Sequence, residues 1–161
     1  QAMANLRQSG LERCIHEFAA SGRLVYGICL GMQLLLEGSE EFGWSAGLGL
    51  LKGFVRKLPA TRNNENRFPV PHVGWNQLLE RSVSWKGTIL EGLEDKTEQY
   101  FVHSYHLPEQ GLDGELSITQ YGTVSLVSSI QSRNVIGTQF HPERSGYLGI
   151  QIYKNLINQI N

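Results

Sequence analysis

The sequence predicts an α/β fold built on an open, mostly parallel sheet with an antiparallel edge, flanked by helices. A short apolar run, Leu24–Ile28, is followed at once by a helical pattern over Leu30–Leu36, which is the strand-then-helix order of an α/β unit. After Val73, several strand-like segments follow one another without helices between them, which indicates antiparallel pairing at one edge. A final apolar helix, Gly146–Ile160, is suited to pack on this sheet.

The elements are expected in a fixed order along the chain. Residues 2–20 have helical spacing, interrupted at Ser9–Gly10, and the first strand and its helix come next. A glycine-rich loop, 38–53, and a short strand, 53–58, precede a loop over 59–71 that is too polar for a core. The later strands are predicted at Val73–Leu79, Gln99–Ser104, Glu115–Gln120, Val124–Ile130 and Val135–Phe140. On the last helix, the residues expected to face the sheet are Tyr147, Ile150, Tyr153, Leu156, Ile157 and Ile160.

Length and composition limit the classes of protein that this chain can belong to. Its 161 residues fit a single domain over 1–161 with a sizeable core. The net charge of −1 gives no general attraction to nucleic acid or to anionic membranes, and no apolar run approaches the about 18 residues of a membrane helix. Two cysteines suit a reducing cytoplasm better than a disulfide scaffold. We expect a soluble, cytoplasmic protein that binds neither nucleic acid nor membranes.

Cys29 lies on the turn between the first predicted strand and its helix. A nucleophile on a strand-to-helix turn is typical of a nucleophile elbow, here with sulfur in place of oxygen, and such a turn holds its central residue in a strained conformation. We expect Gly27 and Gly31 to allow strand and helix to approach closely. Because the thiol would lie at a helix N-terminus, we also expect its pKa to be lowered. The alternative is a buried cysteine packed as a small apolar side chain.

A nucleophilic cysteine needs a base, and the base needs a group that orients it. The segment Gln139-Phe140-His141-Pro142-Glu143 supplies both. His141 follows a strand whose C-terminal end is expected at the same sheet edge as Cys29, where sites form in open α/β sheets. Glu143 can accept a hydrogen bond from the imidazole and fix its tautomer. By itself this segment would more often be an ordinary strand end, and its pairing with the elbow favours catalysis. His72 and His103 carry the same chemistry, but no carboxylate lies near them in sequence.

Together these motifs resemble the class I, or triad, glutamine amidotransferases. Other segments are similar, more narrowly, to the glutaminase subunits of the imidazole glycerol phosphate synthases of histidine biosynthesis. These segments are Ser39-Glu40-Glu41, Gly47-Leu48-Gly49-Leu50, Pro71-His72-Val73-Gly74-Trp75-Asn76 and Tyr100-Phe101-Val102-His103-Ser104-Tyr105. The resemblance implies the flavodoxin-like fold of that family.

The resemblance also implies a reaction. Cys29 would attack the side-chain amide of L-glutamine to give a glutamyl thioester and ammonia, His141 would act as acid and base, and Glu143 would orient it. The backbone N–H of Leu30 would be one donor of the oxyanion hole. The substrate would be held by Gln33, Glu41 and the backbone around His103, Ser104 and Tyr105.

In such families the ammonia passes into a barrel-fold synthase subunit, which implies a heterodimer. The residues that match the subunit junction are Trp75, Asn76, Tyr100 and Arg144. Tyr100 would help to gate the passage, and Trp75 would be an aromatic anchor of the kind that interfaces favour, although both could be ordinary core aromatics. The family usually has lysine where this chain has Arg144, so a point charge is replaced by a planar fork.

One departure from the resemblance concerns the beginning of the chain. Family members carry two more strands and a glycine-rich loop upstream of the position of Gln1, and that loop supplies a second oxyanion donor. The 161 residues contain neither. We therefore expect a partial chain, truncated at the N-terminus, that is poorly active alone, since losing one such donor typically costs about 10²–10³ in rate.

Three alternatives stay open. A paralogous glutaminase could supply ammonia to an amidotransfer step of bacterial surface-polysaccharide sugar synthesis. A non-catalytic docking subunit would not need the intact set of Cys29, His141 and Glu143. An elbow-cysteine hydrolase or peptidase fits Gln33 and Glu41 poorly. No metal and no other cofactor is expected, because the histidines and cysteines lack ligand spacing and amide hydrolysis through a thioester needs none.

Overall fold

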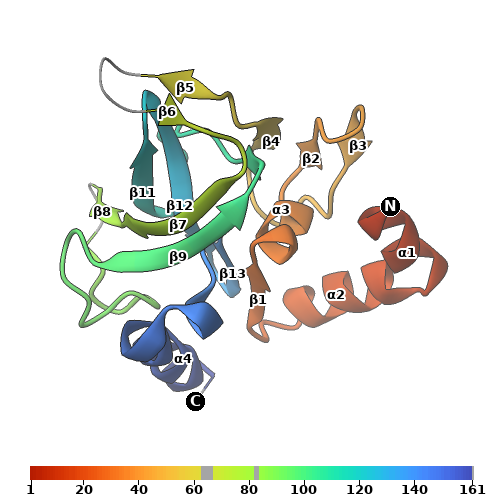
Figure 1. Ribbon diagram of the computed structural model, residues 1–161. Helices are drawn as coiled ribbons and strands as arrows, with labels where there is room; N and C mark the ends of the chain where they lie inside the picture. The colour runs from red at the N-terminus through yellow and green to blue at the C-terminus, as the bar shows by residue number, and fades with distance from the viewer. Residues whose placement is uncertain (63–66, 82–83, 161) are drawn as a thin grey trace.

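The central sheet of the protein is mixed, and helices cover both of its faces (Figure 1). The computed structural model describes residues 1–62, 67–81 and 84–160. Along these residues the sheet has the strand order β1-β13-β12-β11-β8. Its strands are β1 (Val25–Ile28), β8 (Leu79–Glu80), β11 (Glu115–Tyr121), β12 (Val124–Ser132) and β13 (Val135–Thr138).

The strand pairings confirm the α/β class and the antiparallel edge. Strand β1 pairs with β13 in parallel, with Ile28 opposite Thr138, while β13, β12, β11 and β8 pair with one another antiparallel. The antiparallel part takes in more of this sheet than expected. Short turns join β11 to β12 and β12 to β13, and turns this short can connect only antiparallel neighbours.

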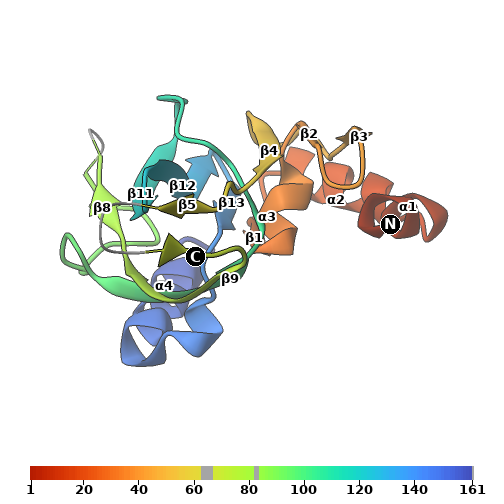
Figure 2. The ribbon, with the colours of Figure 1, turned by 45° about the horizontal axis from the view of Figure 1, so that its top comes forward.

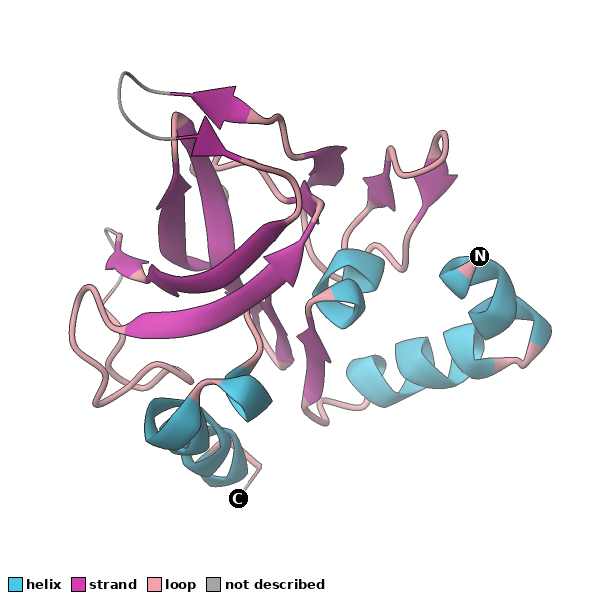
Figure 3. Cartoon of the chain, viewed as in Figure 1, coloured by secondary structure: helices cyan, strands magenta, loops and turns pink. Residues whose placement is uncertain are grey.

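The helices lie in two groups, beside β1 and below the sheet in the view of Figure 3. Their bounds are α1 (Ala2–Gln8), α2 (Leu11–Ala20), α3 (Leu30–Leu35), the 3₁₀ turn η1 (Pro142–Arg144) and α4 (Gly146–Asn158). The predicted interruption between α1 and α2 is confirmed, and Gly10 takes the left-handed conformation there. Across the described ranges, no helix combines the length and the apolarity that a membrane crossing would require.

Strands β12 and β13 are buried on both faces because helices pack on each side. Val127 and Val135 belong to one apolar cluster together with Met32 of α3. Their neighbours Leu126 and Ile136 point the other way, into a second cluster that includes side chains of α4. This alternation follows from the period of two along a strand.

A two-stranded ribbon lies on the α4 side of the sheet (Figures 1 and 2). It consists of β7 (His72–Gln77) and β9 (Glu98–His103), which pair antiparallel with His72 opposite His103 and Trp75 opposite Tyr100. Its inward residue Phe101 is fully buried in the cluster that contains Ile152 and Leu156 of α4. The ribbon thus has one face in the core and one face outward.

Short strands occur in two segments where the sequence predicted loops. One small sheet has the order β10-β4-β2-β3, and β5 pairs with β6 as a hairpin. The loop predictions for 38–53 and 59–71 were therefore partly wrong, and residues 63–66 lie outside the described residues. Polar two-residue strands can pair with each other without a core, which is why the apolar pattern did not reveal them. Their bounds are β2 (Gly38–Ser39), β3 (Ser45–Ala46), β4 (Phe54–Lys57), β5 (Thr61–Arg62), β6 (Arg67–Phe68) and β10 (Tyr105–His106).

The predicted inward face of α4 was largely wrong. Among the predicted residues, Leu156 is buried, whereas Tyr147, Ile150, Ile157 and Ile160 are exposed. The inner stripe is instead Gly149, Ile152, Asn155 and Leu156. The amide of Asn155 donates to the carbonyls of Ile89 and Glu91 at 2.9 and 2.8 Å, so a polar residue is stable inside. Because apolar residues occur on more than one side of this helix, periodicity alone could not select the buried side.

The elbow before α3 depends on one of its two glycines. A Cβ on Gly27 would lie 2.6 Å from the carbonyl carbon of Gly31 and 2.7 Å from Cδ1 of Leu35, whereas a Cβ on Gly31 would meet nothing within 4 Å. The close approach of β1 and α3 therefore requires glycine at 27, and the expectation that Gly31 is also required was wrong.

We predict opposite effects for the two matched substitutions. Gly27→Ala should lower the free energy of unfolding by about 1–3 kcal/mol through overpacking. Gly31→Ala should leave it unchanged or raise it by up to about 1 kcal/mol, since alanine is the better helix former. Urea unfolding of both variants measures this, and equal destabilisation by the two would contradict the argument.

Candidate active site

Cys29 forms a strained nucleophile elbow between β1 and α3. Its backbone has φ 49° and ψ −105°, a conformation that costs a non-glycine residue about 1–3 kcal/mol. The Cys29 N–H donates to the carbonyl of Thr138 at 2.7 Å. This bond extends the parallel pairing of β1 and β13 by one residue and fixes the cysteine at the C-terminal end of β1.

His141 leaves β13 at the same end of the sheet. Its Nδ1 lies 2.6 Å from Oε1 of Glu143, and its Nε2 is buried with no hydrogen-bond partner among the described residues. A carboxylate only accepts, so the neutral imidazole carries its proton on Nδ1 and keeps a lone pair on Nε2. This is the protonation state that a general base requires.

The sulfur of Cys29 has polar neighbours that the sequence analysis did not identify. It lies 3.7 Å from the carbonyl of Val102, to which the thiol donates, and 3.5 Å from Nε2 of Gln139, which donates to it. Gln139 is fully buried. A polar residue inside the predicted apolar strand Val135–Phe140, two residues before His141, was the signal that could have revealed it.

Burial raises the pKa of the Cys29 thiol, against the expectation of a lowered pKa. Desolvation is the largest cause, and the negative charge of Glu143 adds to it. The Leu30 N–H and the Gln139 amide stabilise the thiolate, but by less than burial destabilises it. The thiol therefore stays protonated at neutral pH, and a nucleophilic role would require transfer of its proton to a base.

The structure brings some of the expected substrate-binding residues to Cys29 and not others. Nε2 of Gln33 donates to the carbonyl of Tyr105 at 2.8 Å and to Oε1 of Gln139 at 3.0 Å. The neighbouring Ser104 uses its carbonyl to accept from Leu58. Glu41 lies in the loop after β2, and within the described chain no hydrogen bond or ion pair connects its carboxylate to this group. Among the described residues, neither Glu41 nor Ser104 forms a hydrogen bond or ion pair with Cys29, Gln33 or Gln139, so their substrate-binding roles stay predictions.

Three of the residues expected at a subunit junction, Trp75, Tyr100 and Arg144, form an outward cluster. The amide of Asn76 lies on the inward face instead, near Nε2 of His72 and the Gln120 carbonyl. The Trp75 ring packs edge-on against Tyr100 at 6.1 Å between centroids, and the Arg144 guanidinium lies 4.5 Å above the Tyr100 ring. Trp75 is 53% exposed, so the core alternative is wrong for this tryptophan. The Tyr100 carbonyl accepts the backbone N–H of His141 at 2.8 Å, which connects this cluster directly to the base.

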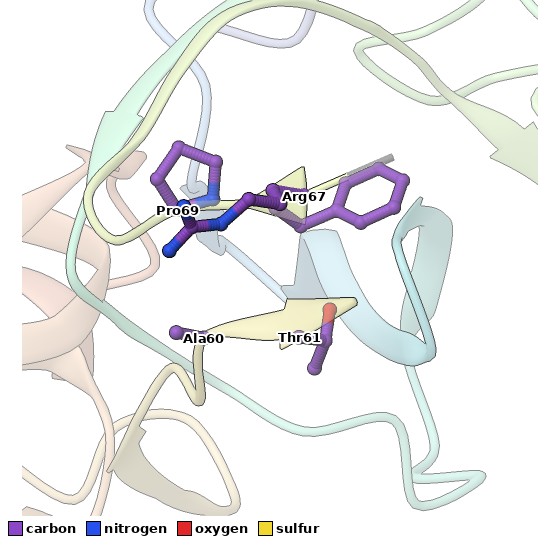
Figure 4. A pocket seen from close by; sticks show the side chains of 5 residues that line it. Ala60, Thr61, Arg67 and Pro69 are labelled. Atoms are coloured by element: carbon purple, nitrogen blue, oxygen red, sulfur yellow. The ribbon is translucent and has the colours of Figure 1, made fainter. Parts of the chain in front are cut away.

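A hollow of about 790 Å³ lies apart from these residues, at the β5–β6 hairpin (Figure 4). Its lining includes none of the residues around Cys29. The lining residues are Ala60, Thr61, Arg67, Phe68 and Pro69.

The fold and the site together define a class of protein. A cysteine on a strained strand-to-helix turn, at the same sheet edge as a histidine that is hydrogen-bonded to a carboxylate, is typical of α/β enzymes that work through a cysteine nucleophile. The family model "Glutamine amidotransferase class-I" matches residues 5–159. The chain belongs to the class I glutamine amidotransferase family.

Relatives of known name agree with this membership. The chain is similar to "Imidazole glycerol phosphate synthase subunit HisH" of Bacillus subtilis, with 45% identity over 94% of this chain and 69% of the relative. It is similarly related to the protein of the same name from Wolinella succinogenes, with 44% identity over 96% of this chain and 73% of the relative. Among solved structures, "PurLQS from Thermotoga maritima" has the same fold, with a TM-score of 0.62 and 22% identity over 94% of this chain and 68% of that chain.

We predict that Cys29 titrates above the ordinary thiol pKa. In a Cys14→Ser background, the rate of alkylation by iodoacetamide followed against pH reports Cys29 alone. The midpoint should lie above that of a model thiol, and Gln139→Met should raise it further by removing a hydrogen bond to the thiolate. A midpoint below that of the model thiol would instead indicate a thiolate–imidazolium pair in the resting enzyme.

Proposed function

We propose that this protein is the glutaminase subunit of an imidazole glycerol phosphate synthase. The observation that carries the chemistry is the His141–Glu143 hydrogen bond of 2.6 Å. The opposite imidazole nitrogen is buried and has no partner in the described part of the chain, at the sheet edge where the elbow holds Cys29. The similarity to relatives of that name over most of the chain supports the choice of pathway.

The reaction follows from the protonation states of the site. His141 Nε2 takes the proton of the Cys29 thiol as sulfur attacks the amide carbon of L-glutamine, and the Leu30 N–H donates to the oxyanion. His141 then gives its proton to the leaving nitrogen, so ammonia departs and a glutamyl thioester remains. Water attacks the thioester with His141 as base, which releases L-glutamate and restores the thiol.

The neighbouring polar groups have roles in this proposal. Glu143 stabilises the imidazolium that forms in each step. Gln33 and the backbone of 103–105 line the substrate end of the site, and Glu41 faces the α-ammonium of glutamine. Because Cys14 and Cys29 are both free thiols, a reducing cytoplasm suits the enzyme.

The ammonia acceptor is a barrel-fold synthase subunit that binds the outward cluster in a heterodimer. Trp75 offers exposed aromatic surface there and packs against the half-buried Tyr100, and Arg144 offers a cation held over the Tyr100 ring. Asn76 lies beside Trp75 on the same strand. In this proposal Tyr100 gates the passage of ammonia, and its carbonyl accepts the backbone N–H of His141 at 2.8 Å.

We predict the following results for glutamate release from glutamine by the full-length protein. The release is measured with and without an imidazole glycerol phosphate synthase cyclase subunit and its nucleotide ligand. The wild-type rate should rise strongly with the cyclase subunit, and Cys29→Ala should abolish turnover. His141→Asn should lower kcat by about 10²–10⁴, and Glu143→Gln should lower it less. Hydrolysis that depends on Cys29 but does not respond to the cyclase subunit would refute the partner and point to another ammonia acceptor. Absence of hydrolysis in every combination would refute the glutaminase.

We also predict that Trp75 anchors the partner. Trp75→Ala should raise the Kd for the cyclase subunit by about 30-fold or more, as expected of an interfacial hot spot. Trp44 is a matched control, since it is 64% exposed but lies in the loop between β2 and β3. Isothermal titration calorimetry with the cyclase subunit measures the Kd of the Trp75→Ala and Trp44→Ala variants. An equal loss of affinity in the two variants would argue against the outward cluster as the interface.

A further inference from the structure

The inward face of the β7–β9 ribbon carries a buried pair of histidines that the glutaminase chemistry does not use. Nδ1 of His72 lies 3.0 Å from Nε2 of His103. Nδ1 of His103 lies 2.9 Å from the carbonyl of Tyr105, and Nε2 of His72 lies 3.3 Å from Nδ2 of Asn76. The exposed fractions of His72 and His103 are 2% and 6%, so water does not compete for these bonds.

The hydrogen bonds of this pair have a single possible direction. The Tyr105 carbonyl can only accept, so His103 carries its proton on Nδ1 and accepts through Nε2. His72 must then donate from Nδ1, which leaves its Nε2 to accept from the Asn76 amide. The amide of Asn76 is itself oriented, because it also donates to the carbonyl of Gln120 at 3.0 Å.

This direction requires both imidazoles to be neutral. Burial lowers the pKa of His72 to about 4, and burial together with the neighbouring histidines lowers the pKa of His103 to about 3. Each ring therefore has one proton to donate at neutral pH. The His72 ring is also fixed by stacking, at 4.0 Å from Tyr121 and 4.9 Å from Phe101 between centroids.

The chain of hydrogen bonds that begins at Asn76 continues from the histidine pair to the sulfur of Cys29. The Tyr105 carbonyl accepts a second bond, from Nε2 of Gln33, and that amide also donates to Oε1 of Gln139. Nε2 of Gln139 then donates to the sulfur of Cys29 at 3.5 Å. Both hydrogens of the Gln33 amide are used, so its orientation depends on where the Tyr105 carbonyl lies.

We propose that His72 and His103 are positioning residues for Cys29, acting through the oriented hydrogen-bond chain that runs from Asn76 through both imidazoles, the Tyr105 carbonyl, Gln33 and Gln139 to the sulfur. This proposal deepens the glutaminase function and rests on it. Asn76 lies next to Trp75 of the outward cluster, so the chain begins beside the surface proposed to bind the synthase. The histidine pair fixes the Tyr105 carbonyl, and this carbonyl sets the amide that stabilises the Cys29 thiolate.

Two substitutions of His72 separate the hydrogen bond from the ring. His72→Phe keeps a stacked ring between Tyr121 and Phe101 but removes the donor to His103. His72→Asn keeps an amide N–H near the position of Nδ1 but removes the ring. The variant that keeps the ring, His72→Phe, should keep more of the thermal stability. The variant that keeps the hydrogen-bond donor, His72→Asn, should keep the alkylation rate of Cys29.

The readouts are the alkylation rate of Cys29 by iodoacetamide at pH 7.5 in a Cys14→Ser background and the steady-state kinetics of the full chain with the cyclase subunit. For His72→Phe we expect alkylation to slow by about fivefold and kcat to fall by about tenfold, with a smaller change in KM, because small misplacements of a reacting group are costly. For His72→Asn we expect both rates to stay within about twofold of wild type. In thermal unfolding the order should reverse, and His72→Asn should have a lower Tm than His72→Phe because it lacks the stacked ring.

His106 supplies a matched control. It lies on β10 with an exposed fraction of 4%, and burial lowers its pKa to about 4. The hydrogen-bond chain described from Asn76 to Cys29 does not include it. His106→Leu should reduce thermal stability without slowing alkylation, whereas Gln139→Met, which removes the last bond, should slow alkylation at least as much as His72→Phe.

Several outcomes would overturn the positioning role. One is an alkylation rate of Cys29 in His72→Phe equal to that of wild type. Another is equal slowing of alkylation in His72→Phe and His72→Asn. A third is slower alkylation in His106→Leu in proportion to its loss of stability. If wild type and all variants fail to hydrolyse glutamine, the glutaminase proposal fails, and alkylation still decides whether the chain positions Cys29.

Discussion

The site depends on the parallel pairing of β1 with β13. This pairing brings together two segments that are far apart in the sequence, and the bond from the Cys29 N–H to the Thr138 carbonyl continues it past the end of β1. The strained conformation of Cys29 persists because the strand before it and the helix after it are both packed. His141 follows β13 directly, so the same pairing also sets the base at the edge where the nucleophile emerges.

Burial and hydrogen bonding oppose each other at the sulfur, and burial prevails. Hydrogen bonds from the Leu30 N–H and the Gln139 amide lower the pKa of the Cys29 thiol, but desolvation of the thiolate raises this pKa by more. The Cys29 thiol is therefore held in its neutral form at neutral pH. In the proposed mechanism Cys29 supplies the attacking atom, and the His141–Glu143 pair accepts and returns its proton.

The sequence allowed prediction of the features that depend on neighbouring residues in the chain. The elbow at Cys29 and the His141–Glu143 pair are local patterns, and the structure has both. Gln139 at the sulfur and the bond between His72 and His103 depend on which strands lie side by side, which a single sequence does not reveal. The buried side of α4 was missed for a related reason, since Asn155 is stable inside only because two carbonyls of a distant loop meet it.

The alternation of the β7–β9 ribbon has a consequence for how such a protein can diverge. Trp75 and Tyr100 point outward, while His72 and His103 point inward and lead to the nucleophile. Substitutions of the outward side chains therefore leave the inward hydrogen bonds of His72 and His103 in place. A one-residue insertion or deletion in either strand would exchange the two faces. The length of this ribbon is therefore constrained by its inward face even where its outward side chains change.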